Sequence, residues 1–187
     1  MDEVVALLGE PGERMGDPPS HSPHRPYWLY GNLELQFDLP EDAAPYVEFL
    51  QIDMPERLRK KARRLAKNLM LELHGLNCRS RPSQFIRAID DIDRVELSLI
   101  NSGYPYVTMY VDDFLEINFD HWSLDPIEAP PPLRGYIRRL DTETSVVDLY
   151  SFDARFPSTR SRKAKNWPER YAPFTVTGRD YLKALER

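Results

Sequence analysis

Two pairs of side chains in this sequence have the spacing of metal ligands. His21 and His24 are separated by two residues, and His74 and Cys78 by three. Neutral imidazole and thiolate are the ligands that tetrahedral zinc prefers. Each pair lacks a second cysteine, and the histidine pair lies in a proline-rich stretch. Surface histidines and one small buried cysteine explain the same residues, so the sequence predicts no metal site and no cofactor.

Nucleophilic catalysis would use Cys78, the single cysteine of the chain. Arg79 and Arg81 lie beside it, and nearby cations favour the reactive thiolate. A base must lie within hydrogen-bond reach of the thiol, and the nearest histidine, His74, is expected at the end of a helix. The chain has no Gly-x-Ser-x-Gly motif and no glycine-rich phosphate loop. We therefore expect a protein that is not an enzyme, with an unrecognised catalytic site as an alternative.

Two acidic clusters could bind Mg²⁺ through carboxylate oxygens. One holds Asp90, Asp91 and Asp93, and the other is the pair Asp112 and Asp113. Aspartate is also common at helix ends and tight turns, where its side chain accepts hydrogen bonds from backbone N–H groups. We favour this structural explanation for both clusters.

A basic run has the composition of a nucleic-acid-binding surface. Residues 57–67 contain seven lysines and arginines and no acid. Such a run could neutralise several phosphates, or lie on an anionic membrane. The run holds no aromatic residue for base stacking or membrane insertion, so the sequence predicts no membrane partner. We favour a solvated face for the run, with nucleic-acid binding as the alternative. The candidate nucleic-acid-binding residues are Arg59, Lys60, Arg63, Arg64 and Lys67.

Aromatic and acidic residues gather in the segments expected to form strands. Tyrosine and tryptophan are frequent anchors of protein interfaces, although they also fill cores. Acids beside exposed aromatics would suit a cationic protein partner, as toxins of the nuclease type often are. The candidate partner-binding residues are Trp28, Tyr30, Glu34, Asp38, Tyr106, Tyr110, Glu116 and Asp120.

The elements that position these residues follow from the spacing of apolar side chains. Alternation of apolar and polar residues predicts strands at 27–30, 33–37, 46–52, 94–100, 106–111, 114–119, 136–140 and 145–150. Helices are expected at 2–8, at 84–91 with Ser83 as N-cap, and at 179–186 with Thr177 as N-cap. Leu58, Ala62, Leu65, Leu69 and Leu73 share one helical stripe, which predicts a long helix over 55–74. The fold class is α+β, with a mostly antiparallel sheet and this long amphipathic helix packed on one face.

A six-residue segment occurs twice in similar form. Residues 33–38 read Leu-Glu-Leu-Gln-Phe-Asp, and residues 115–120 read Leu-Glu-Ile-Asn-Phe-Asp. Each copy is expected as the second strand of a hairpin that follows a short helix, which favours a duplicated helix-plus-meander unit over chance. The predicted organisation is a core over 1–125, with repeat units at about 1–54 and 83–120 around the long helix. A proline-rich crossing and C-terminal extension at 126–187 would pack on that core.

Charge alternates in blocks along the 187 residues. The net charges are −10 over 1–56, +9 over 57–87, −10 over 88–153 and +6 over 154–187. Such blocks neutralise one another in a fold or form opposed charged faces. The lone cysteine, and the absence of a long apolar run or a basic leader at Met1, predict a cytoplasmic protein. The sequence leaves the oligomeric state open.

One set of residues resembles a known group of proteins. Leu8-Gly9-Glu10-Pro11, followed by the segment from Trp28 to Phe37, is similar to a pattern in small bacterial immunity partners of polymorphic toxins. A helix that ends before an antiparallel sheet also resembles the folds of the outer-membrane assembly lipoproteins and the β-lactamase inhibitor protein. The resemblance covers about the first 55 residues, and 84–120 more loosely. It implies a bacterial immunity protein or antitoxin that grips its toxin with a concave sheet, and it carries over no contact residue.

Overall fold

The structure is a computed structural model that describes residues 1–16, 26–39, 44–53, 63–89, 92, 94–97, 106–111, 115–120, 132–152 and 174–186. Its described helices are α1 (Asp2–Leu8), α2 (Pro82–Ala88), α3 (Leu133–Glu143) and α5 (Gly178–Leu185). The first six strands are β1 (Glu13–Met15), β2 (Tyr27–Tyr30), β3 (Leu33–Asp38), β4 (Tyr46–Asp53), β5 (Arg63–Ala66) and β6 (Leu69–Leu71). The others are β7 (Arg94–Leu97), β8 (Tyr106–Val111), β9 (Leu115–Asp120), β10 (Ser145–Phe152) and β11 (Phe174–Val176).

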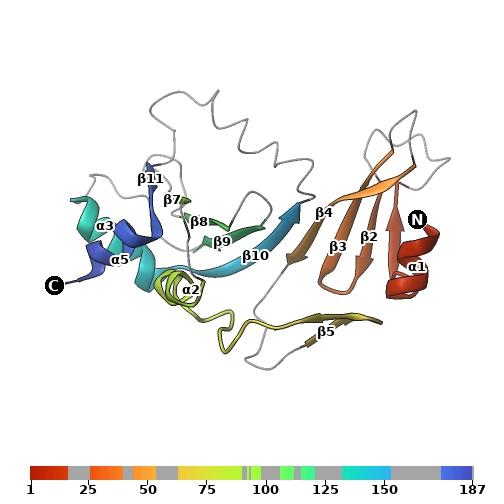
Figure 1. Ribbon diagram of the computed structural model, residues 1–187, viewed down its shortest axis with the longest axis horizontal. Helices are drawn as coiled ribbons and strands as arrows, with labels where there is room; N and C mark the ends of the chain where they lie inside the picture. The colour runs from red at the N-terminus through yellow and green to blue at the C-terminus, as the bar shows by residue number, and fades with distance from the viewer. Residues whose placement is uncertain are drawn as a thin grey trace.

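Nine strands form one sheet in the order β1-β2-β3-β4-β10-β9-β8-β7-β11, and each neighbouring pair is antiparallel. Strands β5 and β6 form a separate hairpin, which lies on the same side of the sheet as α2 (Figure 1). The predicted α+β class and antiparallel sheet are therefore confirmed. β10, from the segment expected as an extension, lies at the centre of the sheet between β4 and β9.

Alternating side chains divide the sheet into a core face and a polar face. In β3, Leu33, Leu35 and Phe37 are buried, whereas the residues between them are partly exposed. The core face holds edge-to-face aromatic pairs, Trp28 with Phe37 in the first half and Phe85 of α2 with Phe119 in the second. Strands with one apolar face are stable only when another layer covers that face. Here α1, α2, α5 and the β5–β6 hairpin contribute residues to that core.

The two copies of the six-residue segment pair with their neighbours in the same way. β3 pairs with β4, and its register shifts between Gln36 and Phe37. β9 pairs with β10, and the register shifts between Val146 and Asp148 of β10. These two residues pair with Phe119 and Asn118 of β9. Phe37 and Phe119 are 1% and 0% exposed. Both phenylalanines therefore point into the core, next to a bulge at the same position of the strand.

A buried carboxylate joins three helices at one end of the molecule. Asp141 of α3 is 4% exposed and accepts hydrogen bonds from the Ser83 backbone N–H (2.7 Å), the Ser83 hydroxyl (3.0 Å) and the Tyr181 hydroxyl (3.4 Å). Ser83 lies in the first turn of α2, whose N-cap is Arg81. The prediction that Ser83 caps this helix is wrong, because its side chain faces Asp141 instead. Thr177 does cap α5, since its hydroxyl accepts a bond from the Asp180 N–H at 3.1 Å.

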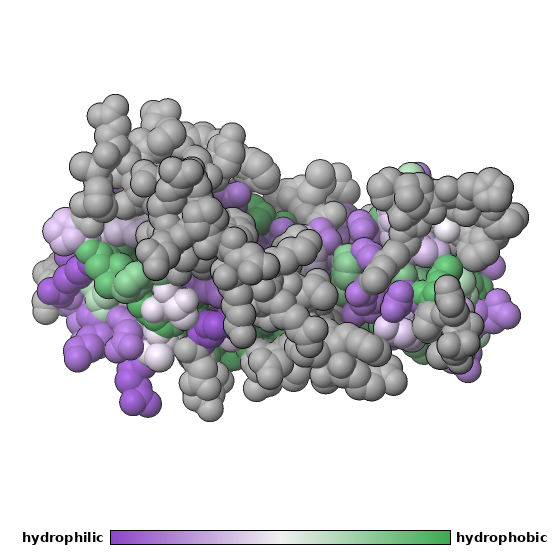
Figure 2. Space-filling model, turned by 90° about the horizontal axis from the view of Figure 1, so that it is seen from above, coloured by the Kyte–Doolittle hydropathy of each residue, from purple (hydrophilic) through white to green (hydrophobic). Residues whose placement is uncertain are grey.

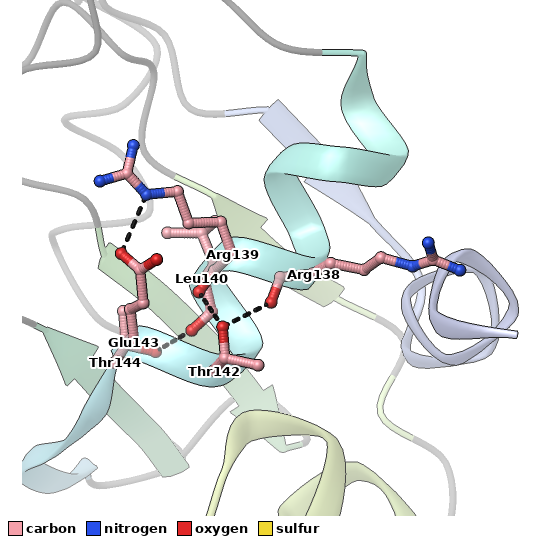
Figure 3. Close-up of polar contacts among 6 residues, drawn as sticks. All are labelled: Arg138, Arg139, Leu140, Thr142, Glu143 and Thr144. Carbon is pink, nitrogen blue, oxygen red and sulfur yellow. Dashed lines mark hydrogen bonds and ion pairs between the residues drawn. The ribbon is translucent and has the colours of Figure 1, made fainter.

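Helix α3 replaces the strand predicted at 136–140. Tyr136, Ile137 and Leu140 are all buried, at the 3–4 spacing of one helical face. At its C-terminal end the Thr142 hydroxyl donates to the Arg138 and Arg139 carbonyls, both at 3.0 Å, and the Thr144 hydroxyl donates to the Leu140 carbonyl at 2.6 Å (Figure 3). The Leu140 carbonyl also accepts from the Thr144 backbone N–H at 3.1 Å, so these side-chain bonds add to the backbone bonds of the last turn.

The long helix predicted at 55–74 is wrong from residue 63 onward. Residues 63–71 form the β5–β6 hairpin, which turns at Lys67 and Asn68; residues 54–62 lie outside the described part of the chain. The hairpin caps the end of α1, because the Lys67 N–H and the Asn68 side chain donate to the Leu8 and Leu7 carbonyls at 3.1 and 2.7 Å. Ala66 is buried by this packing. Tertiary contact therefore decides the conformation of a segment rich in helix-forming residues.

Candidate partner-binding face

The polar face of the sheet carries a continuous row of side chains across six strands. Cα pairing places Arg94, Tyr110, Glu116, Tyr150, Gln51 and Glu34 in order from β7 to β3. A second row holds Glu96, Thr108, Asn118 and Asp148. Figure 2 views the side of the sheet away from α2, and hydrophilic residues show there between atoms drawn in grey. We call Glu34, Asp38, Glu96, Glu116, Asp120 and Asp148, with the tyrosines among them, the acidic face.

Asn118 links two acids of this face to β8. Its amide nitrogen donates to Glu116 at 3.0 Å and to Asp148 at 2.6 Å, and its oxygen accepts from Thr108 at 2.6 Å. Glu116 is only 2% exposed. Burial of a carboxylate is expensive unless polar partners surround it. The asparagine therefore fixes Glu116 and Asp148 close to each other, on neighbouring strands.

Arg94 and two tyrosines form the other end of the acidic face. The guanidinium of Arg94 lies 3.5 Å from the centre of the Tyr110 ring, and its Nε lies 3.6 Å from Glu96. The Tyr110 hydroxyl donates to Glu96 at 3.2 Å. Burial, aided by Glu116 and Glu96, raises the pKa of Tyr110. Burial, then Glu96, raises the pKa of Tyr106 to about 12. Both phenols therefore remain neutral donors at physiological pH.

The acidic face continues into the first half of the sheet. The Tyr46 hydroxyl donates to Asp38 at 2.6 Å, and the Gln36 amide donates to Glu48 at 3.3 Å. Phe49 meets Tyr150 edge-to-face at 6.1 Å, across the β4–β10 junction. Acids and aromatic rings therefore lie side by side across both halves of the sheet.

The structure separates the eight predicted partner-binding residues into two groups. Six of them lie on the acidic face: Glu34, Asp38, Tyr106, Tyr110, Glu116 and Asp120. Trp28 and Tyr30 lie on the core face, opposite Leu35 and Leu33, and are 2% and 9% exposed. The Arg14 guanidinium lies 4.6 Å from the Trp28 ring, and the Tyr30 hydroxyl donates to the Gly9 carbonyl at 3.0 Å. We therefore leave Trp28 and Tyr30 out of the partner-binding surface.

Sequence reasoning missed several residues that complete this face: Arg94, Glu96, Asn118, Asp148 and Tyr150. Arg94 and Glu96 alternate with buried Val95 and Leu97, which is the signal that could have placed them on the polar face. Asp148 and Tyr150 gave no such signal, because their positions depend on β10 joining the centre of the sheet.

The residues considered for metal binding or catalysis do not converge in the described structure. Among described residues, no three His, Cys, Asp or Glu side chains are grouped to hold a metal ion. His74 is exposed in a left-handed turn conformation (φ 47°), and Cys78 is half-buried. His21 and His24, and the acids Asp90, Asp91, Asp93, Asp112 and Asp113, lie outside the described residues.

Three of the five candidate nucleic-acid-binding residues, Arg63, Arg64 and Lys67, belong to the β5–β6 hairpin rather than to a helix. Arg63 begins β5, and Arg64 and Lys67 are exposed. Arg59 and Lys60 lie outside the part of the chain that the structure describes.

Comparison of the chain with known protein families, with curated proteins and with solved structures found no match. Of the helices described, none has both the length and the apolar character needed to cross a bilayer.

Proposed function

We propose that the protein is a non-catalytic binding module whose acidic face holds a cationic partner protein. The observation that carries this proposal is the charge of that face. Its described residues include six carboxylic acids and a single cation, Arg94. A surface of one sign attracts a partner of the opposite sign and accelerates their encounter.

The tyrosines of the acidic face favour a protein as partner over a small ligand. Tyr106 and Tyr110 combine apolar rings with hydroxyl groups that stay protonated, and such side chains are common at the centres of protein interfaces. The rows extend across six strands, a broad surface rather than a single point of binding. The partner class that suits this surface is a basic toxin, which makes the chain an immunity protein or antitoxin.

Association kinetics with the product of a neighbouring gene test the proposal. The acidic variant Glu34→Gln/Asp38→Asn/Asp120→Asn removes three partly exposed charges without touching buried Glu116. We expect the association rate at low salt to fall by about tenfold or more, and protection against the toxic gene product to weaken. The matched control, Arg64→Gln/Lys67→Gln/Arg87→Gln, removes three exposed charges of opposite sign and should neither slow association nor weaken protection. Equal association rates for the two variants would contradict the proposal.

We also infer that the chain arose by duplication of a unit made of one helix and four strands. Three features support this inference. Apart from the added edge strand β11, the order of strands is the same outward from both sides of the β4–β10 junction, each half begins with a short helix, and the two bulges occupy the same position. A duplicated pair of hairpins is expected to keep its register and bulges. An experimental structure in which the two units do not superpose, or in which the bulges differ, would refute duplication.

A further inference from the structure

A segment with two groups of basic residues lies on the side of the sheet that carries α2. Residues 63–89 contain six lysines and arginines and one acid, Glu72. The segment runs from the β5–β6 hairpin to α2 along one side of the molecule (Figure 1). Five of its cationic side chains are exposed: Arg64, Lys67, Arg79, Arg81 and Arg87. We call these five the basic surface.

The charges of the basic surface are not neutralised by the described protein. Described ion pairs join Arg14 with Glu10, Arg94 with Glu96, and Arg139 with Glu143, and none involves the five residues of the basic surface. Exposed cations without acidic neighbours keep their full attraction for an external anion. Five such charges along one segment therefore give this side of the described structure an attraction for an extended polyanion.

Rigid packing on both sides holds the basic surface in place. The hairpin is fixed to α1 by the bonds of Lys67 and Asn68 to the last carbonyls of that helix. Helix α2 is fixed by the bonds of Ser83 to Asp141 and by the packing of Phe85 on Phe119. Charges on a fixed scaffold bind with a smaller loss of conformational freedom than charges on a loop.

The acidic face does not cancel the basic surface, because the two lie on opposite sides of the sheet. A helix layer alone is about 10 Å thick, and the Debye length at physiological ionic strength is about 8 Å. Charges separated by the sheet and the helix layer are therefore largely screened from each other. The net charge of −5 consequently does not prevent this side from binding an anion.

We propose that the basic surface binds the phosphate backbone of double-stranded nucleic acid. A two-stranded ribbon such as β5–β6 fits the major groove of a duplex, which places the cations of the ribbon and of the following helix near phosphates. Binding to single strands relies on exposed aromatic rings that stack on bases. Phe85 is the only Phe, Tyr or Trp of residues 63–89, and it is 2% exposed. The segment therefore favours duplexes.

An anionic membrane is the other polyanion that a basic surface could meet. Membrane-bound segments insert several large apolar side chains between the lipids. Met70, 56% exposed, is the one exposed large apolar residue that the segment offers. The basic surface thus has the charge for a membrane but lacks the apolar anchors, and its chemistry fits phosphodiesters in water.

Salt-dependent binding of the full chain to a DNA duplex of about 20 base pairs tests this proposal. Each neutralised phosphate contributes about 0.9 to the slope of log affinity against log salt, so five contacts give a slope of about −4.5. Raising salt from about 50 to 200 mM should then weaken binding about 500-fold. For the hairpin variant Arg64→Gln/Lys67→Gln, the same rise in salt should weaken binding only about 40-fold. Arg64→Lys, which keeps the charge, should leave the slope unchanged.

A matched control removes two exposed charges from a different element. Arg179→Gln/Lys183→Gln on α5 lowers the net charge by the same amount as the hairpin variant. Its slope of log affinity against log salt should equal that of the parent protein. The proposal is overturned by any of three results: no salt-dependent binding of the duplex, an equal loss for both double variants, or binding of the matched single strand as tight as the duplex. Binding only to vesicles that contain phosphatidylserine would instead assign the basic surface to a membrane.

Discussion

Replacement of Asp141 is the most direct test of how the helical end of the molecule is held together. The Asp141 carboxylate is 4% exposed and accepts two short bonds from Ser83 and a longer one from Tyr181. Asp141→Ala removes both acceptor oxygens, and with them all three bonds, so the N–H and the hydroxyl of Ser83 stay buried without an acceptor from Asp141. A buried polar group that loses its partner is costly, because water cannot replace the partner.

The expected losses differ among variants in a definite order. A hydrogen bond to a charged group contributes about 1.5–3 kcal/mol, so Asp141→Ala should destabilise folding by about 3–5 kcal/mol. Asp141→Asn keeps an oxygen for the Ser83 N–H and should cost about 1–2 kcal/mol. Ser83→Ala removes only the hydroxyl and should cost about 1 kcal/mol. Tyr181→Phe should cost less than Ser83→Ala, because the Tyr181 bond is long at 3.4 Å.

Chemical denaturation followed by tryptophan fluorescence measures these free energies of unfolding. For a domain of this size, each kcal/mol corresponds to about 2–4 °C of melting temperature, so thermal melts give an independent check. Asp141→Ala and Ser83→Ala combined should be less harmful than the sum of the single changes, since both remove the same bond. A loss below about 1 kcal/mol for Asp141→Ala, or equal losses for Ala and Asn, would refute the reasoning.

Three further predictions concern other parts of the fold. The pKa of Tyr106 is raised by burial, and then by Glu96, to about 12, against about 10 in an unfolded chain. Its contribution to stability is therefore complete below pH 10 and is lost as pH rises toward 12, so Tyr106→Phe should shift alkaline unfolding, followed by absorbance at 295 nm, to higher pH. Gly178→Ala should destabilise by about 1–3 kcal/mol in urea denaturation, because its Cβ would lie 2.9 Å from the Ile92 carbonyl oxygen. Phe37→Ala and Phe119→Ala should each cost about 3–5 kcal/mol in the same assay, since both rings are buried beside equivalent bulges.

Most of the sheet was predictable because its strands carry their own burial pattern. The alternation of Leu33, Leu35 and Phe37 with polar residues specifies a strand and the face that it buries. The same reasoning located β2, β4, β8 and β9 within one or two residues. Short edge strands such as β1, whose three residues are all exposed, carry no such pattern and were not expected.

The two errors in secondary structure arose from the choice between a period of 2 and a period of 3.6. Leu69, Leu71 and Leu73 are half-buried and alternate with exposed Met70 and Glu72, which is the pattern of a strand. The surrounding lysines, arginines and leucines have high helix propensity. For this reason a helix was predicted from the 3–4 spacing of the apolar residues, although their alternation indicated a strand. At 133–143 the β-branched and aromatic residues suggested a strand, while the burial of Ile137, Leu140 and Asp141 follows a helix.

The acidic face was predictable only in part, because it combines strands that are distant in sequence. Glu116 and Asp120 could be assigned to it from their alternation with Ile117 and Phe119. The contact of Asn118 with Asp148 requires β10 to lie beside β9, which no local pattern specifies. Trp28 was misplaced because its aromatic character suits an interface as well as a core.

The central position of β10 has a consequence for how the chain folds during synthesis. β1 to β4 pair with sequence neighbours and can form as soon as they leave the ribosome, but the partner of β4 on its other side begins only at Ser145. At 5–20 residues per second, the roughly 90 residues between them take about 5–20 s to synthesise. Throughout that interval the outer edge of β4 has unpaired N–H and carbonyl groups, which readily pair with another chain. The nascent protein is therefore most vulnerable to aggregation at the strand that later becomes part of the centre of its sheet.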